Sequence, residues 1–195
     1  GSGRTLRLST EASLIAGLWY LVTGSRAADG TFTVSQIPIV TPTNSRFAIA
    51  TSLDSTTATV SRKEDLVPAA TDVPLIMAGR YDHTSASGTV VVADHFNGKL
   101  DRPRIHAAAL TPTEAEGHIE NPRGTQLIAA WDFAAEITRD GIKHPRRITD
   151  ASPNRLHGTA ENGPARGVTG YNWRAKEQNF VHAPAEYGAI HFHHD

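Results

Sequence analysis

Residues 96–110 have the sequence FNGKLDRPRIHAAAL, whose side chains alternate like those of a strand except around Pro103. Proline has no backbone N–H to give to a sheet, so in sheets it is found on edge strands or at bulges. Arg102 and Arg104 flank it and, two positions apart, belong to the same face of an extended chain. The stretch therefore predicts an edge strand with a basic face that is either solvated or docked against a neighbouring domain.

Strand signals extend outward from this stretch in both directions. They are short runs of alternating or continuous apolar character with turn residues between them, at residues 5–9, 18–25, 31–40, 47–53, 57–62, 73–79, 89–96, 124–134 and 188–194. Asp29-Gly30 tolerates positive φ and predicts a hairpin between the second and third runs. Trp19, Trp131 and Phe133 lie in such runs, and we expect them in the core.

Helical signals are scarce. Thr111-Pro112-Thr113-Glu114 supplies a capping residue, a proline at the first helical position and an early acid, which predicts one short helix or turn over 112–119. Many short strands with so little helix predict an all-β fold, a two-sheet antiparallel jelly-roll sandwich.

Composition places limits on the class of protein. The chain has 195 residues, a net charge of −1 and no cysteine, and 39% of its residues are hydrophobic. These values suit a single domain without disulfides, and they give no global charge that would attract nucleic acid or a membrane surface. No apolar run is long enough for a membrane span, and no signal peptide opens the chain, so we expect a cytoplasmic protein.

Two regions resemble parts of laminin-G-like, concanavalin A-like jelly rolls. FNGKLDRPRIHAAALTPTEAE (96–116) resembles the closing segment of that fold, and LIAGLWYLVTGS (14–25) resembles its Trp-Tyr strand. LIAAWDFAAEI (127–137) with ITDASPNRLHG (148–158) is similar to its opening strand and turn, yet here the opening follows the closing segment.

This reversed order has two explanations. Either the jelly roll is circularly permuted, or its true opening lies upstream of this chain. Permutation is favoured because it leaves no long unpaired edge, which would be an aggregation liability. We therefore expect one domain over 4–195, in which strands of the opening type (125–195) complete a sandwich with strands of the closing type (4–120).

Residues 125–195 also resemble the region that precedes the catalytic domain in the large (beta) subunit of the N,N-dimethylformamidase family. In that family the catalytic part follows and binds iron through tyrosines and a glutamate, and no such ligand maps onto this chain. The resemblance implies a non-catalytic accessory domain that contacts a downstream catalytic domain or a companion subunit, with homo-oligomers allowed.

Two sets of residues are candidate metal ligands. Asp94, Asn97 and Asp101 cluster around the Asn97-Gly98 turn and offer the oxygen ligands that calcium prefers, although Asx side chains also serve turns alone. His191 and His193 share one face of a strand and could hold a transition metal if a third ligand joined them; otherwise they form a solvated stripe.

Aromatic residues suggest a second function class. Tyr171 and Trp173 lie in a loop-rich segment and could stack on a partner or a sugar, as in an independent carbohydrate-binding module that uses calcium. No pair of carboxylates on a strand suits a glycosidase, and no phosphate-binding glycine motif is present. The sequence therefore predicts neither catalytic residues nor a cofactor other than calcium.

Overall fold

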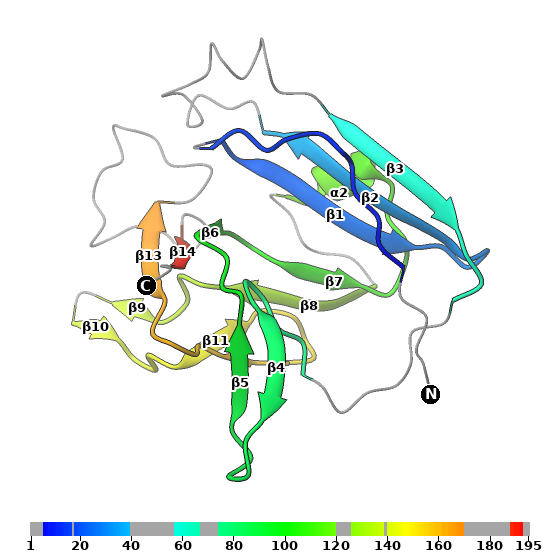
Figure 1. The fold of residues 1–195 in the computed structure, drawn as a ribbon. Coiled ribbons are helices and arrows are strands. Elements are labelled where there is room, and N and C mark those ends of the chain that lie inside the picture. Colours follow the sequence, from blue (N-terminus) through cyan, green and yellow to red (C-terminus); the bar gives the residue numbers. More distant parts are fainter. Residues whose placement is uncertain are drawn as a thin grey trace, which may run out of the picture.

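The computed structural model describes residues 6–16, 18–39, 57–66, 74–119, 126–138, 140–169 and 188–192. Within these ranges the regular secondary structure is almost entirely β-strand, and every strand pairing is antiparallel. The predicted all-β class is confirmed. Figure 1 shows two groups of strands, with β1, β2 and β3 along one side and β7, β8 and β11 along the other.

The first group is a three-stranded sheet in the order β1-β2-β3, formed by β1 (Tyr20–Arg26), β2 (Thr31–Pro38) and β3 (Ala58–Lys63). Its first two strands form the predicted hairpin, closed by a bond of 2.8 Å from Ala27 N to Thr31 O. Asp29 accepts hydrogen bonds from Thr31, and Gly30 has φ of +86°. Asp-Gly chemistry therefore fixes this turn.

The second group holds a four-stranded sheet in the order β12-β11-β8-β7, formed by β7 (Arg104–His106), β8 (Leu127–Asp132), β11 (Arg147–Asp150) and β12 (Gly158–Thr159). Beside it lies a three-stranded sheet, β13-β14-β6, made of β6 (Gly98–Leu100), β13 (Ala165–Thr169) and β14 (Gly188–Phe192). The pairings β7–β8 and β6–β14 join early and late parts of the chain in common sheets.

Two hairpins complete the strands. One pairs β4 (Arg80–Thr84) with β5 (Val90–Ala93) and projects away from both groups in Figure 1. The other pairs β9 (Ile137–Thr138) with β10 (Gly141–Ile142).

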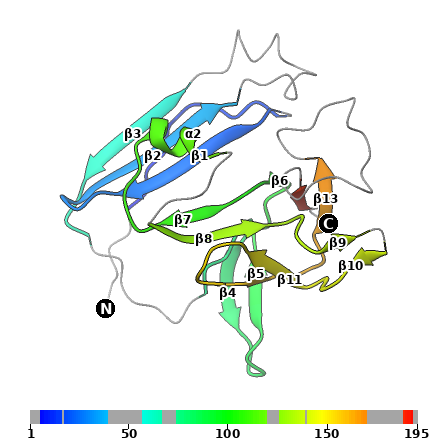
Figure 2. The same cartoon turned by 180° about the vertical axis from the view of Figure 1, so that it is seen from behind.

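The single helix among the described residues is α2 (Pro112–Gly117), where the sequence predicts it. Thr111 and Glu114 cap it reciprocally: the Thr111 side chain accepts from Glu114 N, and the Glu114 carboxylate accepts from Thr111 N. This capping box satisfies two backbone donors that the first helical turn leaves free. Figure 2 shows α2 against the sheet of β1, which it contacts.

The core lies in the second group of strands. Ala129, Trp131, Phe133 and Ile148 are buried together, and partly buried apolar side chains surround them, among them Met77, Leu100 and Ile105. Trp131 donates its indole N–H to Leu156 O at 2.8 Å, so its polar atom is satisfied. Trp131 and Phe133 thus occupy the core as expected, whereas Trp19 is only half-buried and lines the groove described below.

Two predicted strands differ from the structure. Of the strand predicted over 5–9, the described residues 6–9 alternate between half-buried and exposed but pair with no strand, and of the strand predicted over 73–79, the described residues 74–79 are bends and coil. In the second case Pro74 has no N–H to donate and Ala78 has φ of +58°, which an extended strand does not allow. The strand begins one residue after this segment, at Arg80. The prediction for 47–53 lies outside the described residues.

No helix in the described part of the chain is both long and apolar enough to cross a bilayer.

Replacing Ile148 by alanine tests the position of the core. Ile148 is 6% exposed and packs on Trp131, so its truncation leaves a cavity. We expect the free energy of unfolding in urea to fall by about 2–5 kcal/mol. The matched control is Leu75→Ala at a side chain that is 62% exposed, which should change it by less than about 0.5 kcal/mol. Equal losses for the two variants would contradict this core.

Candidate functional site

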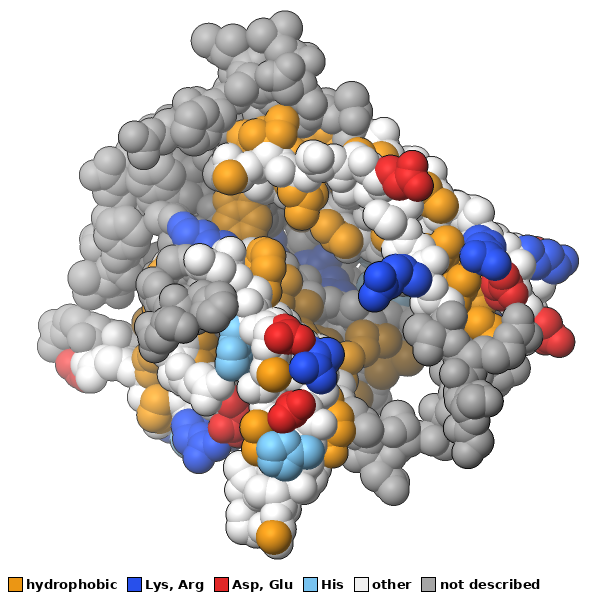
Figure 3. Space-filling model, viewed as in Figure 1, with side chains coloured by type: hydrophobic (Ala, Val, Ile, Leu, Met, Phe, Trp, Pro, Cys, Tyr) orange, Lys and Arg blue, Asp and Glu red, His pale blue; other side chains and the backbone are white. Residues whose placement is uncertain are grey.

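A groove of about 700 Å³ lies between β1 and the segment from Lys99 to Leu110. Its walls include every residue of β1 and of that segment, with the end of α2 at His118 and Ile119. Figure 3 shows the surface hollowed near its centre, where orange hydrophobic side chains gather and blue Lys or Arg side chains lie at the edges. A hollow of this size is in the range of ligand and peptide sites.

Apolar side chains are exposed at the groove. Leu14, Val22 and Phe96 line it and are among the large hydrophobic residues with the greatest exposure, 57%, 62% and 48%. Trp19, Tyr20 and Leu18 line it beside them. An exposed apolar surface in a recess is typical of a site that another molecule covers.

Arg102 and Arg104 lie in the wall formed by the Lys99–Leu110 segment, and both are turned toward the end of α2. Arg104 donates to the carbonyls of His118 and, at 2.7 Å, Ile119, and Arg102 donates to Ile119 O at 3.4 Å. These carbonyls follow the last helical residue, where a positive charge is favourable. Both side chains are half-buried, so they hold the helix end as well as forming the predicted basic face.

Pro103 occupies an edge, as its missing N–H requires. β7 begins at the next residue and is the terminal strand of its sheet among the described residues. Pro103 O accepts a hydrogen bond from Trp131 N at 3.1 Å. Pro103 thus adds one position to the pairing with β8 and uses only its carbonyl group to do so. The edge-strand prediction for this stretch is confirmed within the described part of the chain.

The charge of the groove is positive. Its described lining carries four cationic side chains against one carboxylate, namely Arg26, Lys99, Arg102 and Arg104 against Asp101. Burial lowers the pKa of Lys99, although most of that side chain remains exposed. Burial, followed by the charges of His118 and Arg104, also lowers the pKa of His106, whose ring centroid lies 5.4 Å from that of His118.

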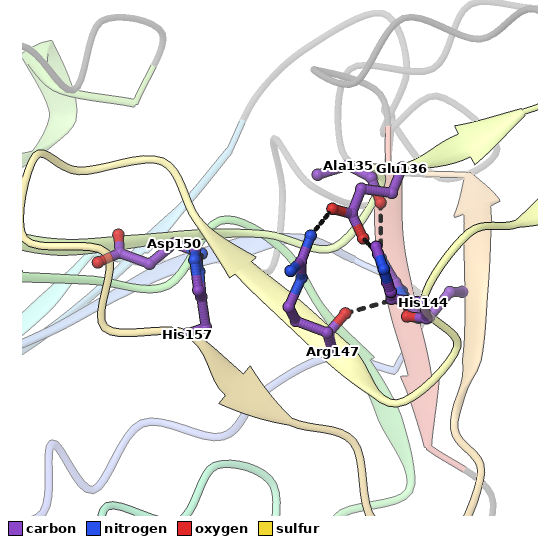
Figure 4. A network of polar contacts seen from close by, with 7 residues as sticks. Ala135, Glu136, His144, Arg147, Asp150 and His157 are labelled. Atoms are coloured by element: carbon purple, nitrogen blue, oxygen red, sulfur yellow. Dashed lines mark hydrogen bonds and ion pairs between the residues drawn. The ribbon is translucent and has the colours of Figure 1, made fainter.

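A second polar cluster lies at the start of β11 (Figure 4). The Glu136 carboxylate accepts from Arg147 and lies 2.9 Å from His144 Nδ1. The hydrogen bonds from Arg147 and then His144 hold the pKa of Glu136 below its usual value. Arg166 donates to the carbonyls of Phe133 at 3.0 Å, Ala135 at 2.8 Å and Arg147 at 3.1 Å. The guanidinium group of Arg166 thus donates to backbone carbonyls, and the cluster holds the segments that carry them together.

A third cluster is the turn that follows Asp150, at the other end of β11. Asp150 is 3% exposed, and its carboxylate accepts from the backbone N–H groups of Ala130, Ser152 and Leu156 at 2.7–2.9 Å. His157 Nδ1 accepts from Asp150 N at 3.1 Å. Burial alone would raise the pKa of Asp150, but the hydrogen bonds outweigh it and the pKa lies below its usual value. The Asp-x-Ser motif therefore organises a turn.

The candidate calcium ligands have different surroundings. Asp94 is exposed and forms an ion pair with Arg80 at 2.6 Å, Asn97 is exposed, and Asp101 is half-buried in the groove wall. The described residues contain no group of three or more His, Asp or Glu side chains that could hold a metal ion. The calcium site at Asp94, Asn97 and Asp101 stays a prediction.

The remaining candidates fall mostly outside the described residues. His191 lies on β14, opposite Ala165 on one side and Lys99 on the other, but only its backbone is described. His193, Tyr171 and Trp173 lie outside the described residues. Their proposed roles in metal or ligand binding stay predictions.

Sequence reasoning missed the groove and its cations Arg26 and Lys99. Lys99 lies in the stretch 96–110 and Arg26 directly follows 14–25, but neither local pattern shows that β1 approaches the Lys99–Leu110 segment to form the groove. Arg166 was also missed, because a lone arginine in a glycine-rich run gives no local sign that four carbonyls will surround it.

Comparison with known proteins gives one family of relatives. No family model matches the chain. It is 38% identical over 199 residues to the N,N-dimethylformamidase beta subunit of Paracoccus aminophilus, and 37% identical over 200 residues to that of an Alcaligenes species. These beta subunits are homologues of the chain over its whole length.

The similarity to the dimethylformamidase beta subunits thus extends beyond 125–195 and includes both walls of the groove. The chain spans about a quarter (26%) of the length of each of these relatives.

The Asp150 turn makes a prediction about stability and pH. Asp150→Ala leaves three backbone donors without their acceptor, and we expect it to lower the free energy of unfolding by at least about 1–3 kcal/mol, the cost of one such buried group. Because the folded-state pKa lies below the ordinary value of 3.8, the charge contributes stability that is fully present above that pH and is lost as the pH falls through the folded-state pKa.

Urea unfolding of wild type and Asp150→Asn between pH 6 and pH 2.5 measures this contribution. The difference between the two proteins should be constant near neutral pH and should shrink below about pH 3.8. Asp65→Asn, at an exposed position, is the control for removing a carboxylate. A difference that grows with acidity would contradict the role of Asp150.

Proposed function

We propose that the chain is a non-catalytic accessory domain of a dimethylformamidase-like amidohydrolase, and that it mediates contacts between domains or subunits. The observation that carries the proposal is the alignment of the whole chain with about one quarter of two dimethylformamidase beta subunits. A protein that matches one part of a larger subunit from end to end is expected to serve as a part of such a subunit. The catalytic metal centre then belongs to another region of the parent protein.

The proposed architecture is a laminin-G-like jelly roll in permuted order. The pairings β7–β8 and β6–β14 support it, because they place strands of the closing type beside strands of the opening type in the same sheets. A permuted chain requires such neighbours, since the first and last strands of the fold are adjacent. A single domain over 4–195 follows from the same proposal.

The polar clusters support a structural role for the described part of the chain. Asp150 accepts from three backbone N–H groups, and Arg166 donates to three carbonyls from two separate segments. Groups that are saturated by backbone hold loops in place and have little capacity left to move protons to a substrate. The groove, with its exposed apolar side chains, is the surface that remains for contacts with a partner.

An independent carbohydrate-binding module is the alternative. Trp19, Tyr20 and Phe96 line the groove, and aromatic rings are the side chains on which sugars stack. Calcium at Asp94, Asn97 and Asp101, and stacking on Tyr171 and Trp173, belong to this alternative. In both proposals the protein is cytoplasmic, without a nucleic-acid or membrane partner.

A chimera tests the accessory role. In the Paracoccus aminophilus beta subunit, the matching quarter is deleted or replaced by this chain, and release of formate from N,N-dimethylformamide and particle mass by light scattering are measured. We expect deletion to lower activity at least tenfold and to change the assembly, and replacement to restore both. The isolated chain should release no formate.

Two results would contradict the proposal. One is turnover by the isolated chain at a rate comparable to that of the intact relative. The other is a deletion that leaves activity and assembly unchanged. A glycan array with and without calcium tests the alternative, which predicts saturable binding that chelation removes.

A further inference from the structure

The positions of the hydrogen bonds between β1 and β2 determine which backbone groups of β1 face away from β2. Trp19 O accepts from Ile39 N at 2.9 Å, and Ala27 N donates to Thr31 O at 2.8 Å. In an antiparallel ladder, successive residues turn their N–H and C=O groups alternately toward the partner strand and away from it. The odd-numbered residues of β1 therefore pair with β2, and the groups of the even-numbered residues, such as Val22 and Gly24, point outward.

The groove runs along this outward edge. Every residue from Tyr20 to Arg26 lines it. Because neighbouring side chains of a strand point to opposite faces, a hollow that touches all seven lies along the edge of the strand. Among the described residues, β1 is the terminal strand of its sheet and β7, in the opposite wall, is the terminal strand of another. The hollow therefore separates two sheet edges and has the shape of a missing strand.

The chemistry of the lining indicates what would fill it. Val22, Leu14 and Phe96 offer exposed apolar surface, and cations, among them Arg26 and Lys99, outnumber carboxylates in the described lining. An acidic occupant would neutralise this excess of positive charge. A second copy of the chain would bring its own cations against these, which disfavours self-association through the same edge.

We propose that the groove is a strand-addition site for an extended acidic segment of a dimethylformamidase-type polypeptide outside the present chain. The segment pairs its backbone with the even-numbered residues of β1 and places alternate side chains against Val22 and the cations. This mode of binding supplies affinity through main-chain hydrogen bonds and specificity through alternate side chains. The proposal rests on the accessory function and identifies the surface that performs it.

Hydrogen exchange of the isolated chain is the first test. By NMR, the amides of Leu21, Thr23 and Ser25 should be protected by pairing with β2. Those of Val22, Gly24 and Arg26 should exchange at least tenfold faster. Equal protection of both sets would show that the edge is already covered and would overturn the proposal.

Peptide binding is the second test, with acetyl-Glu-Val-Glu-Val-Glu-Val-Glu-amide as the probe and its Lys-Val counterpart as the matched control. We expect saturable binding of the Glu peptide, new protection at Val22 and Gly24, and binding of the Lys peptide at least tenfold weaker. N-acetylglutamate should not compete at equal concentration. No binding of the Glu peptide at millimolar concentration, equal binding of both peptides, or competition by N-acetylglutamate would each overturn the proposal.

Variants at Val22 on β1 and at Lys99 on β6 locate the binding in the groove. Val22→Pro removes an outward N–H without removing a bond to β2 and should weaken binding of the Glu peptide at least tenfold, whereas Val22→Ala keeps that N–H and should weaken binding much less. If Val22→Pro does not fold, Lys99→Glu gives an independent readout, because it should weaken the Glu peptide and strengthen the Lys peptide. Unchanged preference in Lys99→Glu, or wild-type affinity in folded Val22→Pro, would overturn the proposal.

The outcomes separate this site from the accessory function. A chimera that restores activity while the peptides fail leaves the accessory domain standing without the strand-addition site. If the Glu peptide binds along β1 but deletion of the matching quarter of the relative changes neither activity nor assembly, the strand-addition site stands and the accessory function does not.

Discussion

The pairing of β7 with β8 is the contact on which the rest of the structure depends. It joins Arg104 to Ala130 and Ile105 to Ala129, and so brings the segment around Pro103 beside the strand that carries Trp131. The core cluster forms on this pair, because Ile105 packs against the buried side chains of β8. The turn of Asp150 and the end of α2 are fastened to the same two strands. Together with the β6–β14 pairing, it places early and late parts of the chain in common sheets.

Several buried or half-buried polar side chains hold backbone groups in place. The Asp150 carboxylate accepts hydrogen bonds from backbone N–H groups, and Arg166 donates to backbone carbonyls. Arg104 also donates to backbone carbonyls, at the end of α2. A buried polar group without partners is costly, so saturation of this kind stabilises irregular loops that have no ladder of their own.

Local chemistry made part of the fold predictable. The Asp29-Gly30 hairpin and the Thr111–Glu114 capping box are each determined within four residues, and both appear where the sequence places them. The strand predictions for 5–9 and 73–79 were wrong over their described residues, because an alternating or apolar pattern shows what a segment buries and does not show whether a partner strand is present. The groove could not be predicted for the same reason. Arg26 and Lys99 belong to segments that are brought together only by tertiary contacts.

The β4–β5 hairpin stands apart from the layers that bury the core. Its tip, Ser85-Ala86-Ser87-Gly88, closes through a backbone bond of 2.8 Å from Ser85 N to Thr89 O, and Gly88 has φ of +80° with open space around its Cα. Small residues at an exposed tip tolerate inserted sequence well. A fluorophore or affinity handle grafted there would report on the molecule in a larger assembly while leaving Trp131 and its neighbours undisturbed.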